Sequence, residues 1–197
     1  AVIKGSFQRS PGTPRQGFVC KIIKPYVLVD LPEELEIIGA LIDLAGEQAA
    51  FYQMEGFNVK DFFINIKSAL ADEIKITEEQ QHFRTAWEFY RDNQRVKVPE
   101  IYSFSTSHVT FMEFLKVQKL VESFPGDRKA NAVLADRLAT VMTFEALFSR
   151  PPVAIFHGDP HGGNVMRLAS DPSDPYKLAM LDWGLMGKFP REQRLQL

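Results

Sequence analysis

The chain has 197 residues, of which 45% are hydrophobic and 24% charged, an ordinary composition for a globular protein with one sizeable core or two small lobes. The net charge of −2 and the absence of any Lys/Arg-rich run give no reason to expect a nucleic-acid partner. No apolar stretch reaches the roughly 18 residues of a membrane-spanning helix, and the single cysteine, Cys20, fits a reducing intracellular compartment.

The N-terminal part predicts a β hairpin followed by a helix. Ala1–Phe7 and Gly17–Ile23 are short β-type runs separated by a Gly/Pro-rich loop. Lys21 lies inside the apolar second run, where it fits either the solvent face of an edge strand or a functional position. Leu31–Tyr52 has helical apolar spacing with Pro32 near its first position, so we expect the helix to begin at Leu31.

The rest of the chain alternates helical periods with short β-type runs. Turn-forming residues separate them, and Pro151-Pro152 ends a long helix. We expect helices at Val59–Leu70, Glu73–Asp92 and Ala130–Arg150, a strand pair at 100–104 and 109–114, and a hairpin of strands 165–168 and 177–181.

Two motifs near the C-terminus carry the chemistry: HGDPHGGN at 157–164 and Asp-Trp-Gly at 182–184. Phosphoryl transfer from ATP needs a carboxylate that orients the nucleophile's proton, and amide and carboxylate oxygens that hold Mg²⁺. Asp159 supplies the first group, and Asn164 and Asp182 supply the second. A polar turn whose side chains cap local backbone is the structural alternative, but it does not explain why Asp182 directly follows an apolar run. We therefore predict a phosphotransferase-type site for ATP and Mg²⁺.

The order of these features resembles the protein-kinase-like superfamily, and within it the UbiB family of atypical kinases, whose eukaryotic members act in coenzyme Q biosynthesis. VCKI at 19–22 resembles the VAVK strand, and EIKITEEQ at 73–80 resembles the ExDxxxEA stretch. The segment from 98 to 114 resembles the strand pair before the hinge. HGDPHGGN stands for the family's HADxHPGN, and DWG for DFG.

The resemblance implies an α+β, bilobal protein-kinase-like fold with the site in the cleft between the lobes. A β-rich N-lobe at 1–114 would carry a helical insert at about 31–70, and 115–197 would form part of a mainly helical C-lobe. The chain begins without Met, and 191–197 has the pattern of a starting helix. We therefore expect a fragment that is truncated at both ends.

The resemblance also implies roles for individual residues. The catalytic residues would be Lys21, Asp159 and Asn164. Lys21 would contact the α- and β-phosphates and be held by Glu79. The alternative interpretation of Glu79 is a solvated charge on a helix face. Met112 would be the gatekeeper, or simply core, and the backbone of Glu113 to Leu115 would bind adenine. These nucleotide-binding residues are Lys21, Glu79, Met112, Glu113 and Leu115.

Two histidines of the loop complete the set. His157 is expected to orient the loop rather than to react. A zinc site at His157 and His161 is a poor interpretation, because that spacing suits a helix and the glycines make this a loop.

Departures from the family pattern keep other functions open. Gly158 and Trp183 are typical of aminoglycoside and choline kinase-like enzymes, Gly162 replaces a proline, and Lys75 replaces the second carboxylate of the ExD feature. The first hypothesis is a UbiB-type atypical kinase or ATPase that transfers phosphate to a small or lipid-related acceptor or to water and supports isoprenoid-quinone or lipid metabolism. The alternatives are a small-molecule phosphotransferase and a non-catalytic, nucleotide-switched scaffold.

The partners that this hypothesis implies are ATP and a phosphate acceptor that the sequence does not identify. Membrane or lipid association would involve regions outside this chain. By family resemblance, the location would be a mitochondrial, plastid or bacterial inner membrane.

Overall fold

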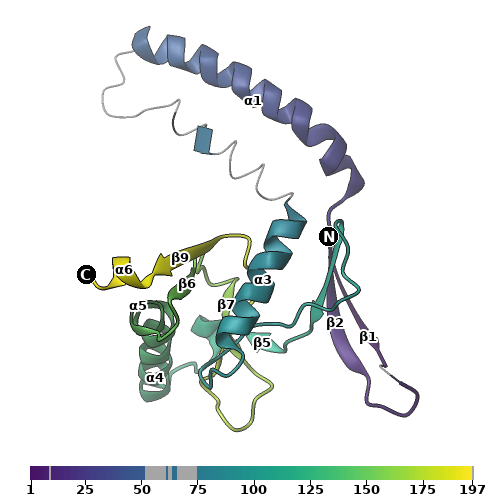
Figure 1. The fold of residues 1–197 in the computed structure, drawn as a ribbon, viewed down its shortest axis with the longest axis vertical. Helices are drawn as coiled ribbons and strands as arrows, with labels where there is room; N and C mark the ends of the chain where they lie inside the picture. The colour runs from purple at the N-terminus through teal and green to yellow at the C-terminus, as the bar shows by residue number, and fades with distance from the viewer. Residues whose placement is uncertain (9, 52–60, 62–63, 66–74, 197) are drawn as a thin grey trace.

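The computed structural model describes residues 1–8, 10–51, 61, 64–65 and 75–196. The fold is α+β, as expected: a β hairpin and a long helix adjoin a body of small sheets and helices (Figure 1). Most of the helix expected at Val59–Leu70 lies outside the described residues.

The first sheet contains the lysine strand. The strands β1 (Val2–Phe7) and β2 (Gln16–Ile22) form the predicted antiparallel hairpin, and β4 (Val109–Glu113) pairs with the other side of β2. Lys21 lies opposite Thr110 in this register. Because β2 is the central strand of the three, the interpretation of Lys21 as an edge-strand residue is wrong.

The helix α1 (Pro25–Phe51) begins six residues earlier than the expected Leu31. Pro25 occupies the first helical position, where its missing amide hydrogen costs nothing, and an apolar run follows that continues the helical pattern. Pro32 therefore lies inside the helix instead of at its start. It removes one backbone hydrogen-bond donor from the helix interior there.

The helix α3 (Ile76–Tyr90) matches the helix expected at Glu73–Asp92, with shorter ends. Its buried residues recur every three or four positions, which places them on one face. That face includes a glutamate and a glutamine. The buried residues are Ile76, Glu79, Gln80, Phe83, Ala86 and Tyr90.

The strand expected at 100–104 does not form. Only an isolated bridge joins Ile101 to Met112, and a turn follows in which the Ser105 amide donates to the Tyr102 carbonyl. The Ser105 hydroxyl then accepts a hydrogen bond from the Phe111 amide at 2.9 Å. A side chain thus takes the place of a ladder partner.

A four-stranded sheet supports the motif loops. Its order is β3-β8-β7-β5, with β3 (Val96–Lys97), β8 (Leu178–Met180), β7 (Val165–Leu168) and β5 (Val117–Gln118). The β7–β8 hairpin was predicted, whereas the parallel pairing of β3 with β8 was not.

A two-stranded sheet was also missed. In it β6 (Val153–His157) pairs with β9 (Met186–Pro190), so that His157 lies opposite Met186. The strands lie on either side of the two motifs in sequence. Their pairing therefore brings the ends of both motifs together.

The helix expected at Ala130–Arg150 exists in three parts. The first part, α4 (Arg128–Ala139), is capped by the Asp127 carboxylate, which accepts from the Ala130 amide at 3.0 Å. A π-helical turn at Thr140–Phe144 then leads into α5 (Glu145–Phe148). Short helices occur at η1 (Leu120–Glu122) and α6 (Arg191–Arg194).

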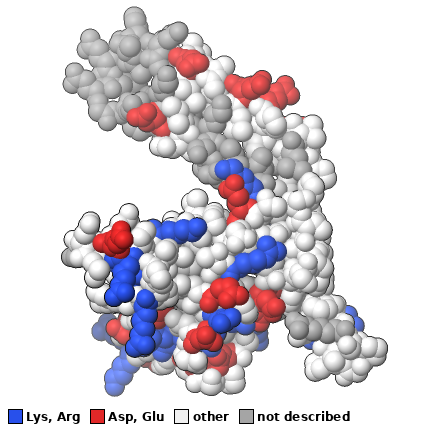
Figure 2. Space-filling view, in the orientation of Figure 1, with Lys and Arg blue, Asp and Glu red and all other residues white. Residues whose placement is uncertain are grey.

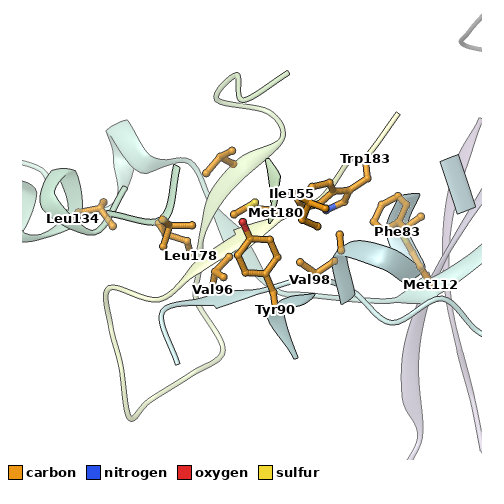
Figure 3. Packing of buried hydrophobic residues seen from close by; sticks show 13 residues of the cluster. Phe83, Tyr90, Val96, Val98, Met112, Leu134, Ile155, Leu178, Met180 and Trp183 are labelled. Carbon is orange, nitrogen blue, oxygen red and sulfur yellow. The ribbon is translucent and has the colours of Figure 1, made fainter. Parts of the chain in front are cut away.

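The main core joins α3 to strands of both larger sheets (Figure 3). Trp183 and Phe83 are fully buried and Tyr90 nearly so. Burying each such aromatic side chain stabilises the fold by roughly 1.5–3 kcal/mol. Since Trp183 lies between Asp182 and Gly184 in the chain, the same packing fixes the backbone of the DWG motif.

Candidate functional site

Three charged side chains from different elements meet at one point. Lys21 Nζ of β2 lies 2.6 Å from Glu79 Oε1 of α3 and 3.7 Å from Asp182 Oδ2. The Lys21–Glu79 contact joins residues 58 positions apart in sequence. The lysine side chain extends from strand β2 to α3, whose buried face carries the glutamate. The structure thus brings together three of the residues that the sequence singles out.

Burial and mutual attraction set the charges of this group. Burial acts to lower the pKa of Lys21, but Glu79 and then Asp182 outweigh it, so the pKa of Lys21 lies above its ordinary value. Burial raises the pKa of Glu79, and Lys21 offsets only part of this rise while Asp182 adds to it. Lys21 is thus held as a cation between two carboxyl groups, and its charge opposes the effect of burial on the pKa of Glu79.

The HGDPHGGN loop begins where β6 ends at His157. The Asp159 amide donates to His157 Nδ1 at 3.1 Å, and the His161 amide donates to the Asp159 carbonyl at 2.9 Å. Asn164 Nδ2 donates to the Asp159 carbonyl at 3.1 Å. The Leu181 amide donates to the Asn164 carbonyl at 2.8 Å, which ties the loop to the residue before Asp182.

His157 is buried and packs against Trp183, with 4.8 Å between the ring centroids. Burial lowers the pKa of His157 below its ordinary value, and the nearby Asp182 opposes this only in part. A neutral ring whose Nδ1 accepts from Asp159 carries its proton on Nε2. His157 therefore orients the loop by packing and by one backbone contact.

The side chains that would hold Mg²⁺ present oxygen atoms. Asn164 uses its amide nitrogen toward Asp159, which leaves its side-chain oxygen for a cation. Asp182 accepts from the Gly184 amide through Oδ1 at 2.9 Å, and its half-exposed carboxylate keeps unused lone pairs. Amide and carboxylate oxygens are both ligands that suit a hard cation. In the described part of the chain, no cluster of three or more His, Cys, Asp or Glu side chains has the geometry of a metal site.

The segment expected to bind adenine follows β4. Met112 is buried and packs in the main core. The Glu113 amide donates to the Glu100 carbonyl at 2.8 Å, and the Phe114 amide donates to the Gly17 carbonyl at 3.1 Å. Leu115 is also largely buried and packs in a second, smaller cluster.

Comparisons with known proteins identify the family of the chain. A family model described as the ABC1 atypical kinase-like domain matches residues 15–197. The chain belongs to this family. The resemblance to UbiB-type atypical kinases is thereby confirmed, as is the kinase-like fold.

Two similar proteins from Arabidopsis thaliana are the chloroplastic proteins ACTIVITY OF BC1 COMPLEX KINASE 3 and 8. They are 30% and 32% identical to this ABC1 domain over 126 residues each, covering 64% and 61% of the chain. The chain spans only 17% and 15% of their lengths. A structure titled as the complex of Rv3197 with erythromycin, from Mycobacterium tuberculosis, matches with a TM-score of 0.65 and 21% identity, over 89% of this chain and 41% of that one. At this identity the match supports the fold alone.

One residue of the ABC1 site was missed by sequence reasoning. His82 Nδ1 lies 3.0 Å from the Trp183 carbonyl, so α3 contacts the DWG backbone as well as Lys21. A cavity of about 250 Å³ beside this contact is lined in part by Glu79, His82 and Gly184. The only sequence signal was the position of His82 three residues after Glu79, which places both on adjacent turns of one helix face.

Proposed function

We propose that this ABC1 domain binds Mg·ATP and is the catalytic part of an ATP-dependent phosphotransferase or ATPase. The observation that carries the proposal is the contact of Lys21 with both Glu79 and Asp182. A purely structural ion pair needs only one carboxylate. The second carboxylate, that of Asp182, places the lysine between α3 and the motif that would hold the metal. This arrangement suits a cation that must reach phosphate oxygens while Asp182 holds Mg²⁺.

Each residue then has a distinct task. Lys21, positioned by Glu79, binds the α- and β-phosphates as a point charge, and Asp182 with Asn164 holds the cation. Mg²⁺ held by these two side chains would supply positive charge that offsets the negative charge of the phosphates. Asp159 orients the attacking hydroxyl or water and accepts its proton. The half-exposed Asp159 carboxylate fits this task, because an acceptor must reach it.

Adenine would bind at the segment after Met112. The amides of Glu113 and Phe114 already donate to protein carbonyls, so the donor for adenine in this segment would be the Leu115 amide. The Glu113 carbonyl would accept from the adenine amino group. We propose the boundary between the two lobes at this same segment, with 1–114 as the N-lobe and 115–197 in the C-lobe.

The phosphate acceptor is proposed as a small or lipid-related molecule or water, in isoprenoid-quinone or lipid metabolism. The family membership supports a kinase-like domain, and the chloroplastic relatives support an organellar setting for it. Among the described residues, no helix combines the length and apolarity needed to cross a bilayer.

The test is phosphate release from Mg·ATP by the wild-type protein and a Lys21→Met variant. Each is assayed alone, with lipid vesicles, and with choline or an aminoglycoside as acceptor. The proposal expects release or transfer that the substitution removes. Binding without turnover under every condition would favour the nucleotide-switched scaffold, and no binding by the wild type would overturn the proposal. Fast transfer to choline or an aminoglycoside would replace the lipid-related acceptor with a small alcohol.

A further inference from the structure

The helix α1 has apolar side chains on two opposite faces. One face is buried or half-buried and contains Leu31, Leu35, Ile38 and Ile42. The other face, here named the outer face of α1, is exposed. Its apolar members are Tyr26, Val29, Ile37, Leu41 and Leu44, each at least half exposed.

The outer face forms one continuous stripe. At about 100° per residue, its five apolar side chains fall within roughly 120° of the helix circumference, and the buried face is centred on the opposite side. From Tyr26 to Leu44 the stripe is roughly 27 Å long at 1.5 Å per residue. Val29 is 74% exposed and Ile37 is 56% exposed, values that a core-facing residue would not have. A helix of a soluble domain ordinarily buries one apolar face and presents polar residues on the other.

Charge identifies the kind of surface that would cover the stripe. All six charged residues of α1 are acidic, and the helix contains no Lys or Arg. Two of them, Asp30 and Glu33, lie on the outer face itself. In Figure 2 the arm formed by α1 shows acidic side chains and no basic ones, whereas the body below it shows basic and acidic side chains together. This pattern opposes contact with an anionic membrane, because like charges repel there.

We propose that the outer face of α1 is a docking surface for a partner protein with an apolar groove rimmed by lysine and arginine. An amphipathic helix in a groove buries alternate turns as anchors, and Ile37, Leu41 and Leu44 have the spacing i, i+4 and i+7 that this needs. The acidic side chains would pair with the basic rim and set the orientation. The surface extends away from the body that carries the catalytic loop (Figure 1), so the proposal is independent of the proposed reaction.

The test uses a defined probe. A synthetic amphipathic helix of about 20 residues, with leucine on one face and lysine on the other, spans ~30 Å and matches the stripe. Its binding is measured by fluorescence anisotropy against the wild-type protein and against the triple variant Ile37→Ser, Leu41→Ser and Leu44→Ser. The matched control is Val121→Ser, a valine that is 88% exposed on another part of the chain.

A charge exchange separates specific docking from general stickiness. The variant Asp30→Lys with Glu33→Lys should lose affinity for the lysine probe and gain it for a probe with glutamate in place of lysine. Circular dichroism confirms that both variants keep their helix content. Because all of these side chains are exposed, the substitutions leave the core unchanged.

The proposal expects the triple serine variant to bind the lysine probe at least about tenfold more weakly than the wild type and the Val121→Ser control. Equal binding by the triple variant, or no effect of the charge exchange, overturns it. Two other occupants are outcomes of the same series. Stronger binding to anionic vesicles than to the probe would assign the face to lipid, and concentration-dependent dimerisation lost in the triple variant would assign it to a second copy. Either result overturns the proposed partner.

Discussion

Substituting Glu79 by glutamine should weaken Mg·ATP binding by changing where Lys21 lies. The substitution keeps the size of the side chain and removes its charge. Lys21 would then have one carboxylate within reach, that of Asp182, at 3.7 Å in the present arrangement. A lysine drawn to Asp182 competes with the cation that this carboxylate is proposed to hold.

The distances give the size of the effect. At an effective dielectric constant of about 20, unit charges attract by roughly 6 kcal/mol over the 2.6 Å to Glu79 and by roughly 4.5 kcal/mol over the 3.7 Å to Asp182. The difference of about 2 kcal/mol is what keeps Lys21 on Glu79. Because the side chains of Lys21 and Asp182 are 32% and 41% exposed, solvent screening reduces it to about 1–2 kcal/mol. Binding should therefore weaken about five- to thirtyfold.

The assay is calorimetric titration of Mg·ATP into the wild type, Glu79→Gln and the control Glu78→Gln. Glu78 precedes Glu79 on α3, its side chain is 63% exposed, and it pairs with Lys75 at 3.7 Å instead of with Lys21. The control should bind as the wild type does. The reasoning is refuted if Glu79→Gln binds Mg·ATP within about twofold of the wild type, or if Glu78→Gln loses as much.

Three further predictions concern stability. His157→Gln should flatten the pH dependence of the melting temperature below about pH 6.5. The pKa of His157 in the folded protein lies below its ordinary value, so the unfolded chain takes up the proton first and the wild type loses stability as the pH falls. Melting curves at about pH 7.5 and about pH 5.5 should therefore show a smaller drop in melting temperature for the variant than for the wild type. Asp127→Ala removes the cap of α4 and should lower the free energy of unfolding in urea by about 1 kcal/mol, whereas exposed Asp136→Ala should leave it nearly unchanged. Phe83→Ala should cost about 3–5 kcal/mol in the same assay, against almost nothing for Val121→Ala; a loss below about 1 kcal/mol would contradict the core assignment.

Much of the site could be anticipated because its members lie in short motifs. Asp159 and Asn164 belong to one loop, and Asp182 follows a buried strand, so local spacing was enough to group them. The contact of Lys21 with Glu79 spans 58 residues, and the expectation rested on the family resemblance. Periodicity gave α3 and its buried face, although it gave no reason to expect that Glu79 would be buried.

The elements that were missed depend on tertiary contacts. The strand β6 pairs with β9, which lies beyond both motifs in the sequence, so their pairing becomes visible only in the fold. The π turn at Thr140–Phe144 leaves the apolar pattern of the long helix almost unchanged. The start of α1 was misplaced because both Pro25 and Pro32 suit a first helical position. The segment at 100–104 has strand composition, but a serine side chain takes the backbone partner.

The account depends most directly on the different tasks of Asp182 and Asp159. The measurement is Mg·ATP affinity together with phosphate release for Asp182→Asn and Asp159→Asn, beside the wild type. The account predicts that Asp182→Asn loses Mg²⁺-dependent binding, because the substitution removes the negative charge that attracts the cation and leaves only neutral oxygen ligands. It predicts that Asp159→Asn binds nearly normally without turnover. Unchanged affinity and turnover in both variants, or an equal loss of binding in both, would contradict it.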